Sequence, residues 1–432
     1  MSLADFILIA ECLGKNMSST ILHLDTIRTD VRHRADYGSG AFVGENARHY
    51  YHTYKLFRGA KHPPVKLAFY PGFQDLAVFL TSAALGAWVG PTIKRATGKP
   101  IFSQMRDMIS LWYKQGIDPP SYYALEFYDE NRSLGAPQYL TRFETKNGLL
   151  KSLNLRKKSP YAISEMNNKD LFATCCRAAG LPHPVTIARI DNGRFVLERP
   201  EQELQQDLFC KRINGMGATG TRQFKHVSPL HYRDENGEFT SLSQIAETLV
   251  GLSKKHPMVM QPWLKNHVEI ADIALDSLLT FRVITVMNEQ GLPETTLAML
   301  RLLSKLEPQW SHLPDDEYAA PIDLTTGRLG RLTGDNLKTS HIRYSKHPVT
   351  GKQLHGRIVS QWPAIQSLAI EAHKAFTHRT LIGWDIALTP AGPVLLEGNT
   401  NFDVMFLQRV HDAPAAASRF GSLLNYHIQN VS

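Results

Sequence analysis

Two carboxylates and one amide near the C-terminal end of the chain have the residue types and spacing of a metal site. Asp385 and Glu397 lie on either side of a turn at residues 389–392, and Asn399 follows Glu397 by two positions. An antiparallel hairpin would bring Asp385 back beside Glu397, and residues two apart on a strand point to the same face. Mg²⁺ favours such hard oxygen ligands, with phosphate and water completing its octahedron. The structural alternative is a loop in which Asn399 and Asp403 bond the backbone.

A glycine-rich segment directly follows a strand-like run at residues 208–213. The run carries Lys211, and Gly215, Gly217 and Gly220 stand in the loop behind it. Glycines let the backbone turn its N–H groups toward a bound anion, and the lysine would add a point charge against phosphate. The spacing is neither a Walker loop nor a Rossmann fingerprint. A glycine-rich hairpin turn is therefore an equal alternative to a phosphate-binding loop.

Three isolated basic residues complete the candidate chemistry. Lys169 stands at the head of a helix, Arg282 lies inside an apolar strand, and Arg301 ends the next apolar run. A buried charge such as Arg282 needs a partner, which is either an anionic ligand or a structural Asp or Glu. Together these residues indicate a nucleoside triphosphate held between lysines on one side and a Mg²⁺-binding hairpin on the other, an arrangement suited to phosphoryl transfer.

The elements that must position these residues mix short strands with amphipathic helices. A helix is expected over 169–179, with Asn167 or Asn168 as its cap and Gly180 in the left-handed position that ends it. Further helices are expected near 241–253 and 360–378. Strands are expected at 185–190, 194–197, 208–213, 258–261, 281–286, 295–303, 382–388 and 394–397. Strands in hairpins mixed with helices predict an α+β fold built on antiparallel sheets.

The composition bounds the class of protein. The chain has 432 residues, of which 43% are apolar and 20% charged, and a net charge of +8. These values exclude a disordered or fibrous protein, and a surplus this small does not require nucleic acid as a partner. The first 160 residues are expected to be mainly helical, and the aromatic residues at 122–128 are expected in their core.

Localisation is predicted from cysteine usage and from the apolar segments. Cys12, Cys175, Cys176 and Cys210 lack metal-ligand spacing, so thiols in a reducing compartment are expected. The N-terminus has no basic lead, so no signal peptide and a cytoplasmic location are predicted. The longest apolar run, 76–90, is shorter than the roughly 20 residues of a membrane span and is expected to be a buried helix.

The segment 383–399, GWDIALTPAGPVLLEGN, resembles the signature of the sugar-transfer-associated group of the ATP-grasp superfamily. Supporting similarities lie in the Lys211 strand and glycine loop and at 168–172, 179–182, 280–285 and 322–327. The resemblance implies an ATP-grasp fold, in which two α+β subdomains clamp a nucleotide, preceded here by a mainly helical region. The implied boundaries are 1–160 for that region, 161–262 for the subdomain with Lys211, and 263–432 for the subdomain with the metal site.

The resemblance also implies roles for individual residues. Lys169 and Lys211 would bind the ATP phosphates, and the loop of Gly215, Gly217 and Gly220 would close over them. Gln261 and Trp263 would belong to a hinge that reads adenine through its backbone, and Glu269 would bind ribose. Arg282 and Arg301 would face the γ-phosphate or a substrate carboxylate. Asp385, Glu397 and Asn399 would bind Mg²⁺, expected as two ions, with Mn²⁺ as an alternative.

The implied activity is that of an ATP-dependent carboxylate–amine ligase, which forms an amide through an acylphosphate and releases ADP and phosphate. A phosphotransferase acting on a sugar or other hydroxyl, and a non-catalytic nucleotide-binding subunit, are the alternatives. The stretch 310–317 departs from the pattern of the group, so the acceptor is expected to differ from that of its relatives. Residues 1–150 stand where other ATP-grasp enzymes place a substrate-recognition domain.

Overall fold

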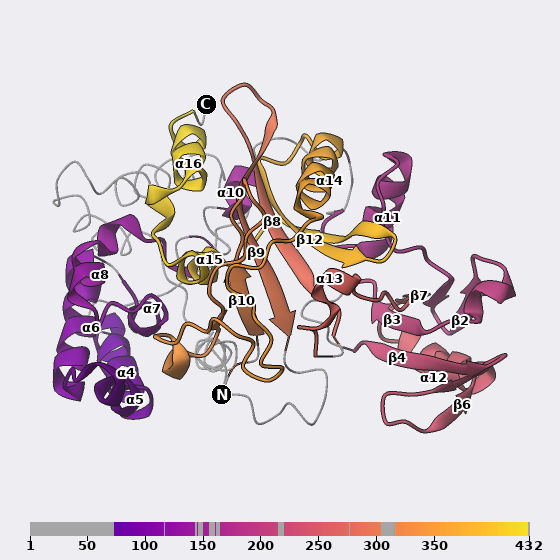
Figure 1. Cartoon of the computed structure of the whole chain (residues 1–432), viewed down its shortest axis with the longest axis horizontal. Coiled ribbons are helices and arrows are strands. Elements are labelled where there is room, and N and C mark those ends of the chain that lie inside the picture. Colours follow the sequence, from indigo (N-terminus) through magenta and orange to yellow (C-terminus); the bar gives the residue numbers. More distant parts are fainter. Residues whose placement is uncertain are drawn as a thin grey trace.

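The computed structural model describes residues 73–115, 117–142, 145, 150–154, 160, 165–214, 220–275, 277–303, 315 and 317–430. A helical N-terminal part lies at one end of the molecule, a six-stranded sheet lies in the middle, and a seven-stranded sheet lies at the other end (Figure 1). All strand pairs in both sheets are antiparallel. The predicted α+β class is therefore confirmed.

The helical N-terminal part is built around buried aromatic side chains. Its described elements are α4 (Phe73–Trp88), α5 (Gly90–Thr97), α6 (Ile101–Gln115), α7 (Pro119–Ala124), α8 (Glu130–Leu134), η2 (Ala136–Gln138) and α10 (Leu150–Asn154). Tyr122, Tyr123 and Phe127 are fully buried in its core, as the sequence predicts. Residues 1–72 lie outside the described part of the chain, and Cys12 with them.

The prediction of a buried helix at 76–90 is only partly correct. Helix α4 buries one face, which includes Leu85 and Ser82, but leaves Leu76, Phe79 and Leu80 between 51% and 57% exposed. Apolar residues cover more than one face of this helix, so the core can use only some of them. Within the described residues, no helix has the length and apolar character needed to cross a membrane.

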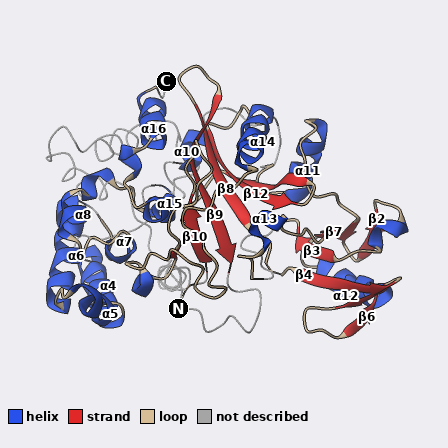
Figure 2. Cartoon of the chain, in the orientation of Figure 1, coloured by secondary structure: helices blue, strands red, loops and turns tan. Residues whose placement is uncertain are grey.

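The seven-stranded sheet has the order β2-β1-β7-β3-β4-β5-β6. Its strands are β1 (Ala188–Asp191), β2 (Arg194–Leu197), β3 (Leu208–Arg212), β4 (Arg222–Ser228), β5 (His231–Arg233), β6 (Phe239–Ser241) and β7 (Met258–Pro262). The turn η4 (Glu201–Leu204) precedes β3, and helix α12 (Leu242–Ser253) packs on β1 and β2. Figure 2 shows this sheet and its helix beside the larger central strands. Strand β3, which carries Lys211, is an interior strand of the sheet.

The six-stranded sheet has the order β11-β10-β9-β8-β12-β13. Its strands are β8 (Thr280–Met287), β9 (Pro293–Leu303), β10 (Glu317–Pro321), β11 (Thr333–Gly334), β12 (Leu381–Thr389) and β13 (Gly392–Asn399). The predicted hairpins β8–β9 and β12–β13 are confirmed. The other elements of this region are α13 (Val268–Ala271), η6 (Leu337–Thr339), α14 (Trp362–Ala375), α15 (Val404–His411), η7 (Ala415–Ala417) and α16 (Arg419–Gln429).

Helices cover both faces of the six-stranded sheet. On one face, the predicted stripe of α14, including Trp362, Ile365 and Ala369, packs with Val283 and Leu300 in one core. On the other face, α15 and α16 pack in a second core with alternating residues such as Ile284 and Met299. Strand residues alternate between the two faces. A polar residue in these strands therefore lies on a definite side of the sheet.

Helix α11 (Lys169–Ala178) lies where the two sheets meet. The Asn168 side chain accepts hydrogen bonds from the N–H groups of Asp170 and Leu171, and Gly180 has a φ of +66°, so the predicted cap and ending are confirmed. Phe172 stacks on Phe376 with ring centroids 5.8 Å apart, which anchors α11 to the core beneath α14.

Candidate functional site

Six polar side chains form a row across one face of the six-stranded sheet. Asp385 on β12 pairs in register with Glu397 on β13 and with Arg282 on β8, and Arg282 in turn pairs with Met299 on β9. Because side chains alternate along a strand, Arg301 points to the same side as Met299. We call the six residues the charged row; they are Asn399, Glu397, Asp385, Arg282, Arg301 and Glu317.

Asp385 is the centre of the charged row. Arg282 donates from Nε to Oδ1 at 2.5 Å and from Nη2 to Oδ2 at 2.9 Å, and Nη1 of Arg301 lies 3.5 Å from Oδ1. Burial acts to raise the pKa of Asp385, but Arg282 and Arg301 hold that pKa below its usual value. Asp385 is thus an ionised carboxylate at neutral pH, although it is only 5% exposed.

Glu397 and Asn399 lie beside this carboxylate. Nδ2 of Asn399 is 3.4 Å from Oδ2 of Asp385 and 3.3 Å from Oε1 of Glu397. Burial raises the pKa of Glu397, and the neighbouring charge of Asp385 raises it further, while Lys169 and Arg282 act in the opposite direction. The predicted closeness of the three side chains is confirmed. Asp403 belongs to a different local structure, because its side chain caps α15.

Two lysines reach the charged row from outside the six-stranded sheet. Lys169 begins α11, and its N–H donates to the carbonyl of Ile213 just past β3, so the chain places it close to Lys211. Burial lowers the pKa of Lys211 to about 8, Glu397 acts to raise it, and Lys169 lowers it further. Burial likewise lowers the pKa of Lys169, with Glu397 acting to raise it. The charge of Glu397 thus affects the pKa of both lysines, so its carboxylate lies near both of them.

The balance of charge at this junction favours an anion. Arg282, Arg301, Lys169 and Lys211 are cationic, whereas Asp385, Glu397 and Glu317 are anionic. Arg282 and Arg301 have carboxylate partners on neighbouring strands, and the charge of Glu397 acts on both lysines. Two lysines on one side and paired carboxylates on the other match the requirements of a phosphate chain with a bridging cation.

The glycine loop is described only at its end. Gly215 and Gly217 lie outside the described residues, so their predicted role stays a prediction. Gly220 has a φ of +74°, and a Cβ there would lie 2.5 Å from Nε of Arg212. A residue other than glycine would therefore strain the backbone and displace Arg212, which directly follows Lys211.

The residues predicted to bind adenosine lie near the start of the connection between the two sheets. Gln261 is buried on β7 and pairs with Phe209 on β3, and the N–H of Trp263 donates to the carbonyl of Asp207 at 2.7 Å. The hinge role of these residues stays a prediction. Strand β7 ends at Pro262, directly before Trp263.

Glu269, the predicted ribose ligand, has protein partners for both carboxylate oxygens. Oε2 accepts hydrogen bonds from the N–H of Ser360 at 3.1 Å and from its hydroxyl at 2.6 Å. Oε1 accepts from the N–H of Gln361 at 3.4 Å. The side chain therefore holds the segment that leads into α14. Its role toward ribose stays a prediction.

The donor atoms of the charged row fit Mg²⁺. No group of three or more His, Cys, Asp or Glu side chains suited to a metal occurs in the described part of the chain. The pair of Asp385 and Glu397 with Asn399 is a smaller set of oxygen donors. Burial is the main cause of the raised pKa of Glu397, the neighbouring charge of Asp385 adds to it, and a divalent cation would offset the repulsion between the two carboxylates. Because O and N of an amide exchange by a flip, Asn399 can offer its oxygen to the same cation.

Glu317 is a residue of the charged row that the sequence did not indicate. It forms a two-point ion pair with Arg301, and its side chain is 18% exposed. It lies at the end of the stretch 310–317, where the sequence departs from the expected pattern. It ends a run of three acidic residues, so its residue type alone did not single it out, and only the strand register shows its place beside Arg301.

A family model described as sugar-transfer associated ATP-grasp matches residues 147–419. Among curated proteins, none matches the chain.

Solved structures of ligases are also similar. The D-alanine–D-alanine ligase of Coxiella burnetii is 15% identical, with a TM-score of 0.34, over 61% of this chain and 56% of that one. The L-amino acid ligase of Bacillus licheniformis is 12% identical, with a TM-score of 0.36, over 61% and 48%. The D-alanyl-alanine synthetase A of Vibrio cholerae is 11% identical, with a TM-score of 0.37, over 62% and 65%. The chain thus spans about half to two thirds of the length of these enzymes.

Proposed function

Because the chain belongs to the sugar-transfer associated ATP-grasp family, we propose that it is an ATP-dependent ligase that joins a carboxylate to an amine. The observations that support the proposal are the closeness of Asp385, Glu397 and Asn399 on paired strands and the hydrogen bond from the backbone N–H of Lys169 to the carbonyl of Ile213, which joins the start of α11 to the end of the strand that carries Lys211. That placement suits the binding of a phosphate chain between cationic and carboxylate groups.

The lysines and the oxygen-bearing side chains would bind different parts of the nucleotide complex. Lys169 and Lys211 would neutralise the phosphates from one side. Asp385, Glu397 and Asn399 would hold Mg²⁺, which when bound would withdraw charge from the phosphate oxygens. Arg282 keeps Asp385 ionised and fixed in place, so that this carboxylate is ready to accept a cation.

The reaction would proceed by attack of a substrate rather than of the protein. A substrate carboxylate oxygen would form a bond to the γ-phosphorus as the bond from γ-phosphorus to the β–γ bridging oxygen breaks, which yields an acylphosphate and ADP. An amine would then attack the acyl carbon, phosphate would leave, and the amine would lose a proton to give an amide. Cys210, which lies next to Lys211, is fully buried, and burial raises the pKa of its thiol, so it does not serve as a nucleophile.

Excluding water matters for this chemistry because an acylphosphate hydrolyses readily. A loop between β3 and β4 that closes over the phosphates would provide this protection. The hairpin is anchored at both ends, since Cys210 on β3 pairs with Arg222 on β4. The strand pair thus offers a fixed base for such a loop.

The proposal is tested with purified protein, ATP and Mg²⁺, against a panel of amino acids and sugar acids with and without amines. ADP release that requires both a carboxylate and an amine, together with a product of the mass of the amide, is the expected result. ADP release driven by alcohols, with a phosphorylated product, would show a phosphotransferase instead. Tight nucleotide binding without turnover on any substrate would show a nucleotide-binding subunit.

A further inference from the structure

Arg301 is held in a fixed orientation by Glu317. Nε of Arg301 donates to Oε1 at 2.5 Å, and Nη2 donates to Oε2 at 2.9 Å. The remaining nitrogen, Nη1, lies 3.5 Å from Oδ1 of Asp385. A two-point ion pair fixes both the position and the plane of a guanidinium group. Glu317 therefore determines which N–H groups of Arg301 stay available to a ligand.

Glu317 is itself fixed by the backbone of the sheet. It is the first residue of β10, where its N–H donates to Oδ1 of Asp335 at 3.2 Å. The N–H of Asp335 donates back to the carbonyl of Glu317 at 3.0 Å. The backbone hydrogen bond extends the pairing of β10 with β11 by one step, and the bond to the Asp335 side chain reinforces it. The carboxylate that orients Arg301 therefore belongs to a residue held in a regular β-strand.

Two buried side chains of opposite charge hold the segment that carries Asp335. Arg409, which is 2% exposed, donates from Nη1 to the carbonyl of Asp335 at 3.3 Å and from Nη2 to that of Asn336 at 3.0 Å. Oδ1 of Asp315 accepts from the N–H of Asn336 at 2.8 Å and from the hydroxyl of Thr339 at 2.6 Å. Contacts from both sides leave this segment little freedom to move.

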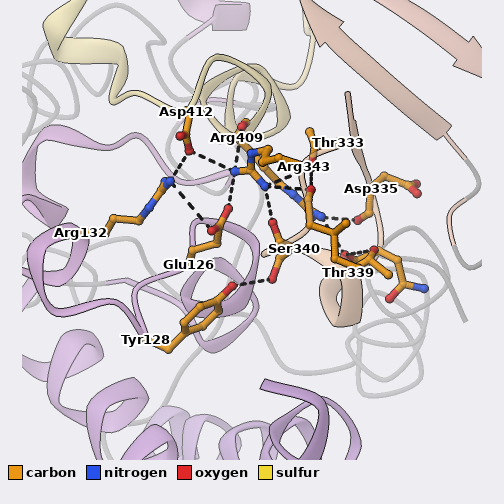
Figure 3. A network of polar contacts seen from close by, with 12 residues as sticks. Glu126, Tyr128, Arg132, Thr333, Asp335, Thr339, Ser340, Arg343, Arg409 and Asp412 are labelled. Carbon is orange, nitrogen blue, oxygen red and sulfur yellow. Dashed lines mark hydrogen bonds and ion pairs between the residues drawn. The ribbon is translucent and has the colours of Figure 1, made fainter. Parts of the chain in front are cut away.

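Side chains of the helical N-terminal part form further ion pairs with residues close to this segment. Nη2 of Arg343 is 2.5 Å from Oε1 of Glu126 and 3.1 Å from Oδ1 of Asp412, and Arg132 pairs with the same Asp412. Figure 3 shows these side chains converging from three parts of the chain around Arg343 and Arg409. Glu126 and Asp412 both adopt positive φ angles, +60° and +57°, which are costly for such residues. The surrounding ion pairs offset that cost.

We propose that Glu317 is a positioning residue, which fixes Arg301 so that its guanidinium edge faces the terminal phosphate of a bound nucleoside triphosphate. The inference rests on the proposed function, because it requires a nucleotide at the charged row. Without the charge of Glu317, the nearest carboxylate to Arg301 is Asp385, which already receives two hydrogen bonds from Arg282. Arg301 would turn toward Asp385 and away from the ligand.

The test compares nucleotides that differ only at the terminal phosphate. Titration calorimetry gives the affinity of the full-length protein for ADP and for the non-hydrolysable β,γ-imido analogue of ATP, both with Mg²⁺. In wild-type protein the analogue should bind more tightly than ADP. In Glu317→Gln we expect this preference to fall by about tenfold while ADP affinity is unchanged. Arg301→Lys keeps the charge but loses the two-point pair, so it should lower the preference similarly.

The double variant Glu317→Gln/Arg301→Lys separates positioning from simple charge. If Glu317 acts through Arg301, the double variant should lose no more preference than Arg301→Lys alone. Glu294→Gln is the matched control, because Glu294 stands on the same strand β9 as Arg301 and forms an equivalent two-point pair with Arg419 on the exposed side. Glu294→Gln should prefer the triphosphate analogue over ADP as strongly as wild type does.

The outcomes separate the inference from the proposed function. Wild-type protein that prefers the triphosphate analogue, with Glu317→Gln showing an equal or greater preference, would overturn the inference and leave the proposed function standing. Wild-type protein that binds neither nucleotide would overturn both. If Glu317→Gln is too unstable to measure, Arg301→Lys and Glu294→Gln still test the inference. An unchanged preference of Arg301→Lys for the triphosphate analogue over ADP would show that a fixed Arg301 guanidinium does not recognise the terminal phosphate.

Discussion

Arg282 and Asp385 lie directly opposite each other on neighbouring strands and form a two-point ion pair in which both side chains are nearly buried. A buried arginine in an apolar strand needs an acidic partner or an anionic ligand. Here the acidic partner is also the predicted metal ligand. The ion pair that satisfies Arg282 therefore also keeps a carboxylate ionised at the point where a cation would bind.

Removing Arg282 should destabilise the fold through this ion pair. Arg282→Met leaves Asp385 as a buried charge that keeps the longer contacts with Arg301 and Asn399 but loses its two-point ion pair, which should cost about 3 kcal/mol of unfolding free energy. Urea unfolding measures the loss. The double variant Arg282→Met/Asp385→Leu removes the unpaired charge and should recover part of the lost stability, whereas equal losses in both variants would show that the unpaired charge is not the cause of the loss.

Glu397 should be required for metal-dependent turnover and dispensable for folding. Glu397→Gln keeps the side-chain volume but removes a carboxylate. We expect turnover to fall at least about 100-fold, which is a larger fall than the one caused by removing a residue that only hydrogen-bonds to a metal ligand. Steady-state ADP release at increasing Mg²⁺ is the measurement. The control is Glu371→Gln on the exposed side of α14, where Glu371 pairs with Lys374. Unaltered activity in Glu397→Gln would remove this residue from the site.

Nucleotide affinity should fall with rising pH because of Lys211. Burial lowers the pKa of this lysine to about 8, so it loses its proton, and with it the positive charge that attracts phosphate, as the pH rises through that value. Calorimetry from pH 7 to 9.5 should show affinity that is nearly constant near pH 7 and weakens above about 8. Lys211→Arg should remove this pH dependence, and Lys211→Ala should weaken binding at every pH. A pH dependence that persists in Lys211→Arg would assign the effect to another group.

His347 should make the protein less stable in acid. The imidazole is 1% exposed, and burial lowers its pKa from 6.5 to about 4, while Nδ1 accepts hydrogen bonds from the N–H groups of Val349 and Thr350. Because the folded-state pKa is depressed, the contribution is fully present above pH 6.5 and is lost as the pH falls toward 4. The loss should approach about 3 kcal/mol. His347→Asn places an amide oxygen near the position of Nδ1.

Chemical denaturation of both proteins between pH 7 and pH 4 measures this effect. His347→Asn should lose less stability than wild type on acidification, because the side chain at position 347 then gains no proton in this range. His411 is buried in the same way, with its pKa lowered to about 4, so some acid sensitivity should persist in the variant. Identical pH profiles for the two proteins would contradict the assignment to His347.

Much of the local structure was predictable because short-range signals determine it. The cap at Asn168 and the apolar stripe of α14 follow from neighbouring residues. The turn at 389–392 and the apolar runs around it suffice to bring Asp385 opposite Glu397, since a hairpin sets its register from its turn. The residue types and this turn are therefore enough to predict that the three oxygen-bearing side chains lie together.

The contacts that were missed depend on register between distant strands. Arg282 and Asp385 are separated by 103 positions, and no local pattern shows that β8 lies next to β12. The partnership of Arg301 with Glu317 requires the pairing of β9 with β10 across a long connection. The hydrogen bonds that Ser360 donates to Glu269 are equally invisible in the sequence, because the two residues are 91 positions apart.

If the lysines at 169 and 211 and the carboxylates at 385 and 397 form one nucleotide site, titration calorimetry with Mg²⁺ and the β,γ-imido analogue of ATP should detect it. Wild-type protein should bind the analogue at a one-to-one ratio. Binding should weaken at least about tenfold when Mg²⁺ is removed with a chelator, or when Lys211→Ala replaces wild type. An absence of measurable binding by wild-type protein, or binding that neither change affects, would show that these four residues do not form a nucleotide site.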